Sequence, residues 1–201
     1  MRNILLTFCI GGALLGPVQT AVADACLESF FQAWTKPRPT TGFVKIHITS
    51  LITGQKPTMN YNISDLATGD WLTQMIDPPN MPWSMAMGKS MYTSNDKGKS
   101  WKKDRDLEEA HSLEAVRRQV AENMRTAKNA KCGTEELNGV PHATVEAEYT
   151  AQGNIFVTDK SWLHPQTQHI VKSESVMRQG KFEIKNIQVV EYLTEFTFPK
   201  P

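Results

Sequence analysis

Most of the chain consists of short segments in which apolar and polar residues alternate, and this period of two constrains the fold more than any other feature. In the first segment, Val44, Ile46 and Ile48 alternate with polar residues. The turns between segments contain Gly or Pro and are too short for the crossover helix that parallel strands require. The pattern therefore predicts one antiparallel sheet of about seven to nine strands. Later strands are expected at 59–63, 71–76, 143–150, 154–162, 169–177 and 181–192, with a last edge strand at 196–198.

Two segments replace this alternation with helical spacing. In the first, Asp24–Lys36, apolar residues recur every three or four positions, and Pro37 follows the last of them. The second runs from Asp104 or Asp106 to about Ala130, with a single apolar stripe and acidic residues ahead of basic ones. The order of short helix, strands, long helix and strands predicts the α+β class: one curved antiparallel sheet whose helices cover one face.

The N-terminus predicts export. Arg2 precedes an uncharged apolar run, and small residues end the segment at Ala21 and Ala23. The run is shorter than the roughly 20 residues that a bilayer-spanning helix needs. We expect residues 1–23 to be a signal peptide, cleaved after Ala23 or alternatively after Ala25, and residues 24–201 to form one domain.

Cleavage leaves a neutral domain with two cysteines. The full chain has 22 Lys and Arg against 21 Asp and Glu, and the predicted signal peptide removes Arg2 and Cys9. A balanced charge argues against a nucleic-acid partner, because binding phosphates needs a basic excess. Cys26 and Cys132 then predict one disulfide in an oxidising compartment. There is no Cys-x-x-Cys motif, so we expect this bond to be structural.

The segment between residues 59 and 91 is unusually rich in methionine and tryptophan. Met81, Trp83, Met85 and Met87 alternate, which places them on one face of an extended segment. Three interpretations stay open: ordinary sheet core, a wall for an apolar ligand, and a Cu(I) site made of thioethers. The candidate ligand-binding residues are Tyr61, Trp71, Met75, Met81, Trp83, Met85 and Met87.

One hairpin motif is recognisable, and signatures of catalysis are missing. Residues 94–101 match the Asp-box pattern Ser-x-Asp-x-Gly-x-Ser-Trp, in which Asp96 binds turn amides and Gly98 takes positive φ. We interpret Ser94, Asp96, Gly98 and Trp101 as a structural turn. The sequence has no nucleophile elbow, phosphate-binding loop or zinc motif, and its histidines are scattered. We therefore expect a non-enzymatic protein with no cofactor and no metal.

The order of elements and several short phrases resemble the LolA-like group of periplasmic lipoprotein carriers. The phrases are Gly88–Tyr92, Leu137–Pro141 and Lys160–Pro165. The resemblance implies a strongly curved half-barrel, helices across its concave side, and an apolar hollow for acyl chains. It implies a soluble periplasmic protein that binds an acyl chain, a lipid or a lipidated partner. The alternatives are an envelope protein-interaction module and a periplasmic Cu(I)-handling protein.

Overall fold

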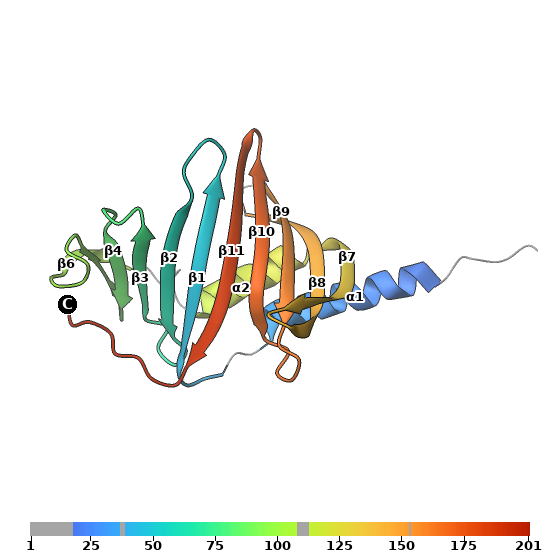
Figure 1. The fold of residues 1–201 in the computed structure, drawn as a ribbon, viewed down its shortest axis with the longest axis horizontal. Coiled ribbons are helices and arrows are strands. Elements are labelled where there is room, and N and C mark those ends of the chain that lie inside the picture. Colours follow the sequence, from blue (N-terminus) through green and yellow to red (C-terminus); the bar gives the residue numbers. More distant parts are fainter. Residues whose placement is uncertain (1–17, 37–38, 108–112, 153) are drawn as a thin grey trace, which may run out of the picture.

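The fold is one antiparallel sheet of eleven strands with two helices on one side, within the residues that the computed structural model describes, 18–36, 39–107, 113–152 and 154–201 (Figure 1). The helices are α1 (Val18–Thr35) and α2 (Leu113–Met124). The strands are β1 (Phe43–Ile52), β2 (Thr58–Asp65), β3 (Trp71–Asp77), β4 (Trp83–Met87), β5 (Ser90–Ser94), β6 (Lys102–Asp106), β7 (Lys128–Leu137), β8 (Val140–Ala151), β9 (Ile155–Leu163), β10 (Ile170–Gln179) and β11 (Phe182–Leu193).

The strand order shows two meanders joined in the middle of the sheet. The order is β6-β5-β4-β3-β2-β1-β11-β10-β9-β8-β7, so neighbours in the sheet are also neighbours in the chain except at β1 and β11. That central pair holds ten residues of each strand in register, from Phe43 opposite Leu193 to Ile52 opposite Ile184. The antiparallel α+β prediction is confirmed. The predicted strand at 196–198 is wrong, because Phe196 and Phe198 instead pack their rings against Phe43.

The long helix predicted from Asp104 or Asp106 to Ala130 is wrong at both ends. Its first residues belong to β6, a fully exposed edge strand of charged side chains, and its last residues belong to β7. Thr126 lies at the end of α2: its hydroxyl accepts a hydrogen bond from the Thr150 amide at 2.9 Å, and it is within donating distance of the Asn123 and Thr150 carbonyls. The helix therefore stops where the chain meets β8. The four strands β4, β5, β6 and β7 have no counterpart among the strand ranges expected from the sequence, and the total of eleven exceeds the expected seven to nine.

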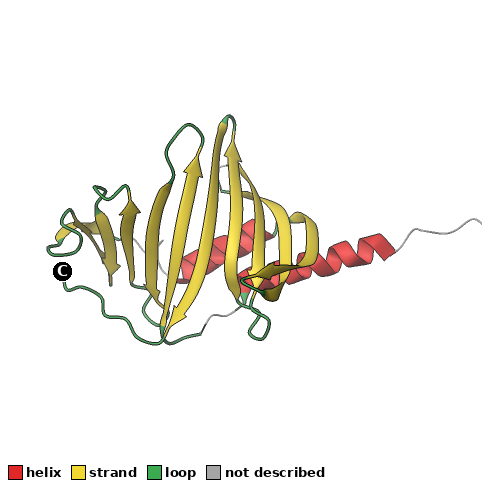
Figure 2. Cartoon of the chain, in the orientation of Figure 1, coloured by secondary structure: helices red, strands yellow, loops and turns green. Residues whose placement is uncertain are grey.

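The helices cover one end of the sheet. Phe30 of α1 and Met124 of α2 form a buried cluster with Val145, Ala147 and Leu163 of β8 and β9. We call the face that carries these three residues and their cross-strand partners the helix-side face, and the opposite one the outer face. Figures 1 and 2 show both helices behind the sheet, and α1 packs mainly on β7 and β8. Both helices thus pack on the same face at that end of the sheet.

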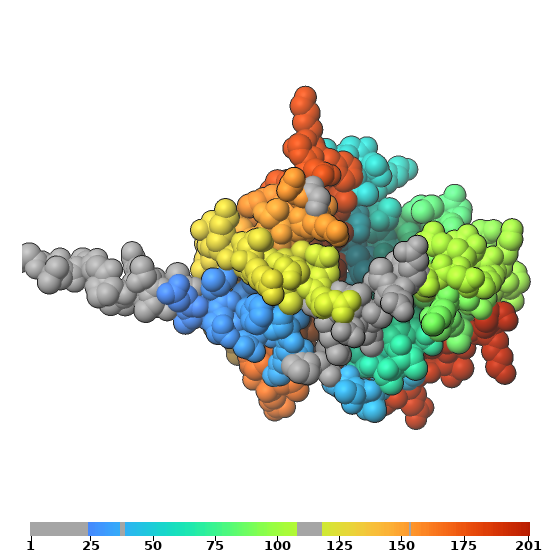
Figure 3. Space-filling model, turned by 180° about the vertical axis from the view of Figure 1, so that it is seen from behind, coloured from blue at the N-terminus to red at the C-terminus, as the bar shows by residue number. Residues whose placement is uncertain are grey.

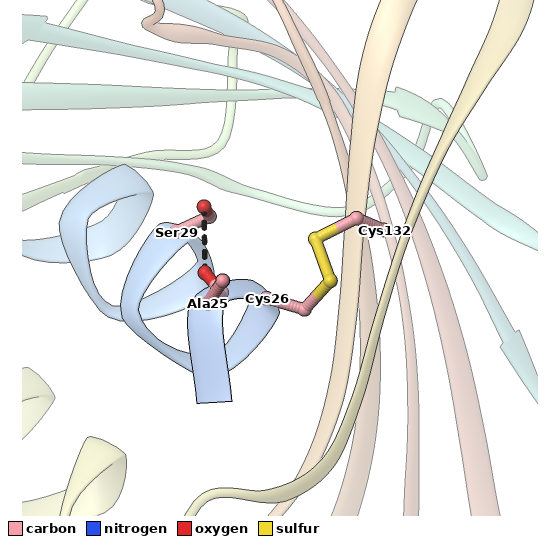
Figure 4. The surroundings of a disulfide bond; sticks show 4 residues. All are labelled: Ala25, Cys26, Ser29 and Cys132. Atoms are coloured by element: carbon pink, nitrogen blue, oxygen red, sulfur yellow. Dashed lines mark hydrogen bonds between the residues drawn. A yellow bond between two sulfur atoms is a disulfide. The ribbon is translucent and has the colours of Figure 1, made fainter. Parts of the chain in front are cut away.

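A disulfide ties α1 to the edge of the sheet. Cys26 of α1 is bonded to Cys132 of β7, as predicted, and the two residues are 106 positions apart (Figure 4). Cys26 is buried, and the next turn of the helix continues with a hydrogen bond from Ser29 Oγ to the Ala25 carbonyl. None of the described helices is long and apolar enough to cross a membrane.

Candidate ligand-binding hollow

A hollow lies between the C-terminal end of α1 and the middle of the sheet. Its apolar wall comes from Trp34 of α1, Ile46 of β1, Ile170 of β10 and Val190 of β11. The hollow opens to solvent, and the roughly 440 Å³ of free space at it includes part of that open solvent. In Figure 3, which views the helix side, the cyan strands beside the helices lie deeper than the helices themselves. The remaining wall residues are Ala33, Lys36, His169, Ser173, Gln188 and Tyr192.

The polar groups in this wall differ in their partners. The Lys36 ammonium donates to the Thr167 carbonyl at 2.8 Å. The indole N–H of Trp34 is buried and has no hydrogen-bond partner among the described residues. The Gln188 amide makes no hydrogen bond within that same part of the chain. The wall is thus about equally apolar and polar, and two of its polar groups, the Trp34 N–H and the Gln188 amide, have no hydrogen-bond partner among the described residues.

Two rows of polar side chains cross the helix-side face next to the hollow. The first runs over five adjacent strands by direct cross-strand pairing, and cross-strand partners share a face. The second lies one step along the same strands and includes a single apolar residue. Together we call them the polar rows: Asp159, Ser175, Asn186, Ser50 and Thr58 in the first, and Ser161, Ser173, Gln188, Ile48 and Asn60 in the second.

Asp159 is the buried carboxyl of the first row. Its residue surface is 2% exposed, and its only described hydrogen bond comes from Ser161 Oγ at 3.2 Å. Burial raises the pKa of the Asp159 carboxyl to about 7, because removing water penalises the ionised form more than the Ser161 bond favours it. Burial, with a smaller contribution from Asp159, also raises the pKa of the nearby Tyr149 hydroxyl.

The seven residues predicted to bind a ligand do not share one face. Trp71 pairs with Ser64, and Met75 with Asn60, which places both on the helix-side face. Met85 pairs with Leu72 on the outer face. Trp83 and Met87 lie two positions before and after Met85 in β4 and therefore face the same side. None of the seven lines the hollow. The outer-face members are Tyr61, Trp83, Met85 and Met87, and Met81 lies in the loop before β4 with 47% of its surface exposed.

The outer-face part of the methionine-rich segment forms a second small core. Ile63, Leu72 and Met85 stand in one cross-strand row and are each at most 2% exposed. Met85 is therefore packed in the sheet. Met75 and Met85 lie on opposite faces, so the candidate thioethers are not all gathered on one surface, although Met85 and Met87 share the outer face. Among the described residues there is also no group of three or more His, Cys, Asp or Glu side chains that could hold a metal.

The Asp-box hairpin packs against this outer-face core. Asp96 accepts hydrogen bonds from Ser94 Oγ at 2.7 Å, and from the amide and hydroxyl of Ser100 at 2.9 and 2.6 Å. Bonds from Ser100 and then Ser94 lower the pKa of Asp96 to about 2. Gly98 has φ +86°, and it sits between the rings of Trp83 and Trp101. The hairpin is therefore a locally bonded turn on the face opposite the hollow.

Replacing Gly98 with alanine is expected to destabilise the fold by about 2–3 kcal/mol, from positive φ together with crowding. The new Cβ would meet the Trp83 ring at 3.2 Å. Gly54→Ala is the matched control, because Gly54 has φ +77° with nothing within 4 Å of the added Cβ. It should cost only about 1 kcal/mol. Equal losses in urea unfolding of the two variants would show that the tryptophan packing contributes nothing.

The sequence indicated the site only in part. The alternation of Val44, Ile46 and Ile48 predicted an inward face for β1, and the spacing within residues 24–36 gave Trp34 an apolar side. Gln188 and Ser173 carried no such signal, because they meet Trp34 only through strand register and the placement of α1. The ligand-binding residues predicted from the methionine-rich segment lie on β2 to β4 and in the loop before β4, outside the hollow.

No model of a protein family matches the chain, and no curated protein matches it significantly. Solved structures do match. A LolA-superfamily protein of Nitrosomonas europaea is 9% identical, with 88% of this chain and 95% of that chain covered and a TM-score of 0.35. A domain described as an outer-membrane lipoprotein-sorting protein, from Vibrio parahaemolyticus, is 10% identical, with coverage of 87% and 95% and a TM-score of 0.36.

A third match is a chain of the MucA/MucB complex of Pseudomonas aeruginosa, 10% identical, with a TM-score of 0.45. It covers 84% of this chain and 56% of that chain. The first two matches belong to the group that the sequence was predicted to resemble. All three TM-scores are below 0.5, so these likenesses carry no conclusion about what the present chain binds.

Proposed function

We propose that this chain is an exported, non-enzymatic binding protein of the periplasm, whose hollow receives an acyl chain, a lipid or the lipid group of a modified partner. The observation that carries the proposal is the hollow itself. Trp34, Ile46 and Val190 present apolar surface to an open hollow next to the C-terminal end of α1. Apolar surface left facing a hollow is costly in water and is relieved by an apolar ligand.

The dimensions of the elements support the same proposal. Eleven strands spaced about 4.8 Å apart make a sheet roughly 48 Å wide along its curve. The 12 residues of α2 extend only about 18 Å. The main contacts of α1 with the sheet are on β7 and β8, and those of α2 are on β8, so the described helix contacts lie toward one end of this face.

Cleavage of the proposed signal peptide is compatible with this packing. The cleavage site after Ala23 lies inside α1, but the first side chain of the helix described as buried is Cys26. Asp24 and Ala25 are exposed. A domain that begins at residue 24 would thus keep the disulfide, Phe30 and Trp34.

Native mass spectrometry of the protein, purified from the periplasm without refolding, tests the proposal. We expect a bound mass of several hundred daltons that is released on denaturation and identified as a lipid. Val190→Phe should abolish the bound mass by filling the hollow. Val189→Phe is the matched control, because Val189 neighbours it on β11 but lies on the outer face with 47% of its surface exposed.

Two outcomes would count against the proposal. A bare mass for the wild-type protein, two daltons light for the disulfide, would redirect the search to a protein partner. A bound lipid that survives Val190→Phe as fully as Val189→Phe would place the ligand elsewhere. Circular dichroism of both variants checks that each remains folded.

A further inference from the structure

The helix-side face is polar but nearly uncharged at its centre. From β9 through β10, β11 and β1 to β2, cross-strand register places one charged residue on this face, Asp159. The outer face of the same five strands carries many charges, several in ion pairs such as Lys45 with Glu191 and Lys185 with Glu174. The two faces therefore present different chemistry, and the uncharged one borders the hollow.

Several groups in the polar rows have unused hydrogen-bonding capacity. Ser50 Oγ donates to Asn186 Oδ1 at 2.7 Å, which leaves the Asn186 amide nitrogen without a partner in the described part of the chain. The side chains of Gln188 and Ser175 make no hydrogen bond to any described residue. Amide and hydroxyl groups offer both donors and acceptors and need a complementary partner when water is excluded.

The charge of the helix-side face favours some polar groups of a ligand over others. A phosphate or carboxylate would meet no cation on the polar rows, where the one charged residue is itself acidic. The side chains near the ligand that can carry positive charge, Lys36 and His169, lie in the wall of the hollow and outside those rows. A quaternary ammonium would meet a single carboxyl that is buried beneath its neighbours. Hydroxyl and amide groups match the mixed donors and acceptors of Gln188, Asn186 and Ser175 without any charge to compensate.

We infer that the ligand is an amphiphile whose polar part is neutral and rich in hydroxyl or amide groups, and that this part lies on the polar rows while its apolar chain occupies the hollow. This inference rests on the proposed function. The two share one site, because Gln188 and Ser173 belong both to the polar rows and to the wall of the hollow. The unpartnered Trp34 N–H at that wall is a further donor for a hydroxyl oxygen.

Three amphiphiles with the same dodecyl chain and different polar groups show how much the polar group contributes to the affinity. Delipidated protein is titrated by isothermal calorimetry with dodecyl maltoside, dodecyl phosphate and dodecyltrimethylammonium, each below its micellar concentration. We expect dodecyl maltoside to bind at least tenfold more tightly than either charged compound. Gln188→Leu, which keeps the size of the side chain, should reduce that preference to less than threefold.

A variant that gains affinity provides a control, because a loss of affinity can also result from poor folding. Gln188→Lys places a cation beside the hollow and is expected to raise the affinity for dodecyl phosphate at least tenfold. Val189→Lys adds the same charge to the neighbouring outer-face position and should leave that affinity unchanged. A misfolded protein cannot show the gain.

The possible results separate the two ideas. Equal binding of all three compounds would overturn the inference and leave the proposed function standing. Tighter binding of dodecyl phosphate or dodecyltrimethylammonium would overturn the inference as well, and would show which charge of the ligand the site recognises. Failure of all three to bind would remove the proposed function, and the inference with it.

Discussion

Replacing Cys26 and Cys132 together by serine is expected to reduce the free energy of unfolding by about 4–5 kcal/mol, the loop-entropy value for a closure of this length. The bond closes a loop between residues 106 positions apart, which restricts the unfolded chain over half of the sequence. Urea unfolding of the purified domain measures the loss. Wild-type protein unfolded under a strong reducing agent is the control and should lose a similar amount.

The same variant should also weaken ligand binding. The disulfide joins α1 to the edge strand β7, and α1 carries Trp34 into the wall of the hollow. Without the bond, α1 is held on the sheet mainly by Phe30 and its neighbours in the buried cluster. We expect the bound mass in native mass spectrometry to decrease in the double serine variant. A loss of stability below about 1 kcal/mol in both the variant and the reduced protein would contradict the loop-entropy argument.

The cysteine pair and the antiparallel sheet were predictable because each depends on a local or compositional signal. Once residues 1–23 are predicted to be removed with Cys9, Cys26 and Cys132 have only each other as partners, and period-two alternation is visible within a single strand. The ends of α2 were not predictable. The stripe through Val116, Val120 and Met124 continues in the sequence to Ala127, but the helix ends at Met124, and the Thr126 hydroxyl accepts a hydrogen bond from the amide of Thr150, a residue 24 positions away.

The face of the sheet on which a residue lies could not be predicted from the sequence either. Alternation within β4 correctly put Trp83, Met85 and Met87 on one face, yet it could not say that this face is opposite the helices. The outer face has its own cover, where the Asp-box turn places Gly98 against the rings of Trp83 and Trp101. Polar rows arise only from register: Ser50 and Asn186 meet across the central strand pair although 136 positions separate them.

The second large effect concerns Asp159 and pH. The folded state holds the pKa of this carboxyl at about 7, above the model-peptide value of 3.8. Between these two values the folded protein keeps a proton that the unfolded chain has lost, so unfolding releases a proton. The free energy of unfolding should therefore fall as pH rises from about 4 to 7, by up to about 1.4 kcal/mol per pH unit and on the order of 4 kcal/mol in total. Above pH 7 this contribution is constant.

Asp159→Asn removes the titrating group while keeping its size. We expect the variant to lose most of the decline in stability between pH 4 and 7, and to be more stable than the wild type at pH 8, as measured by urea unfolding at a series of pH values. Ser161→Ala is the matched comparison. It removes the hydrogen bond that lowers the pKa of Asp159, so the free energy of unfolding of this variant should continue to fall to a higher pH than that of the wild type. Parallel pH profiles for Asp159→Asn and the wild type would show that Asp159 titrates as it does in the unfolded chain. If the decline is found, Asp159 is neutral below pH 7, and the helix-side face from β9 to β2 then carries no charge at the surface where we place a neutral ligand.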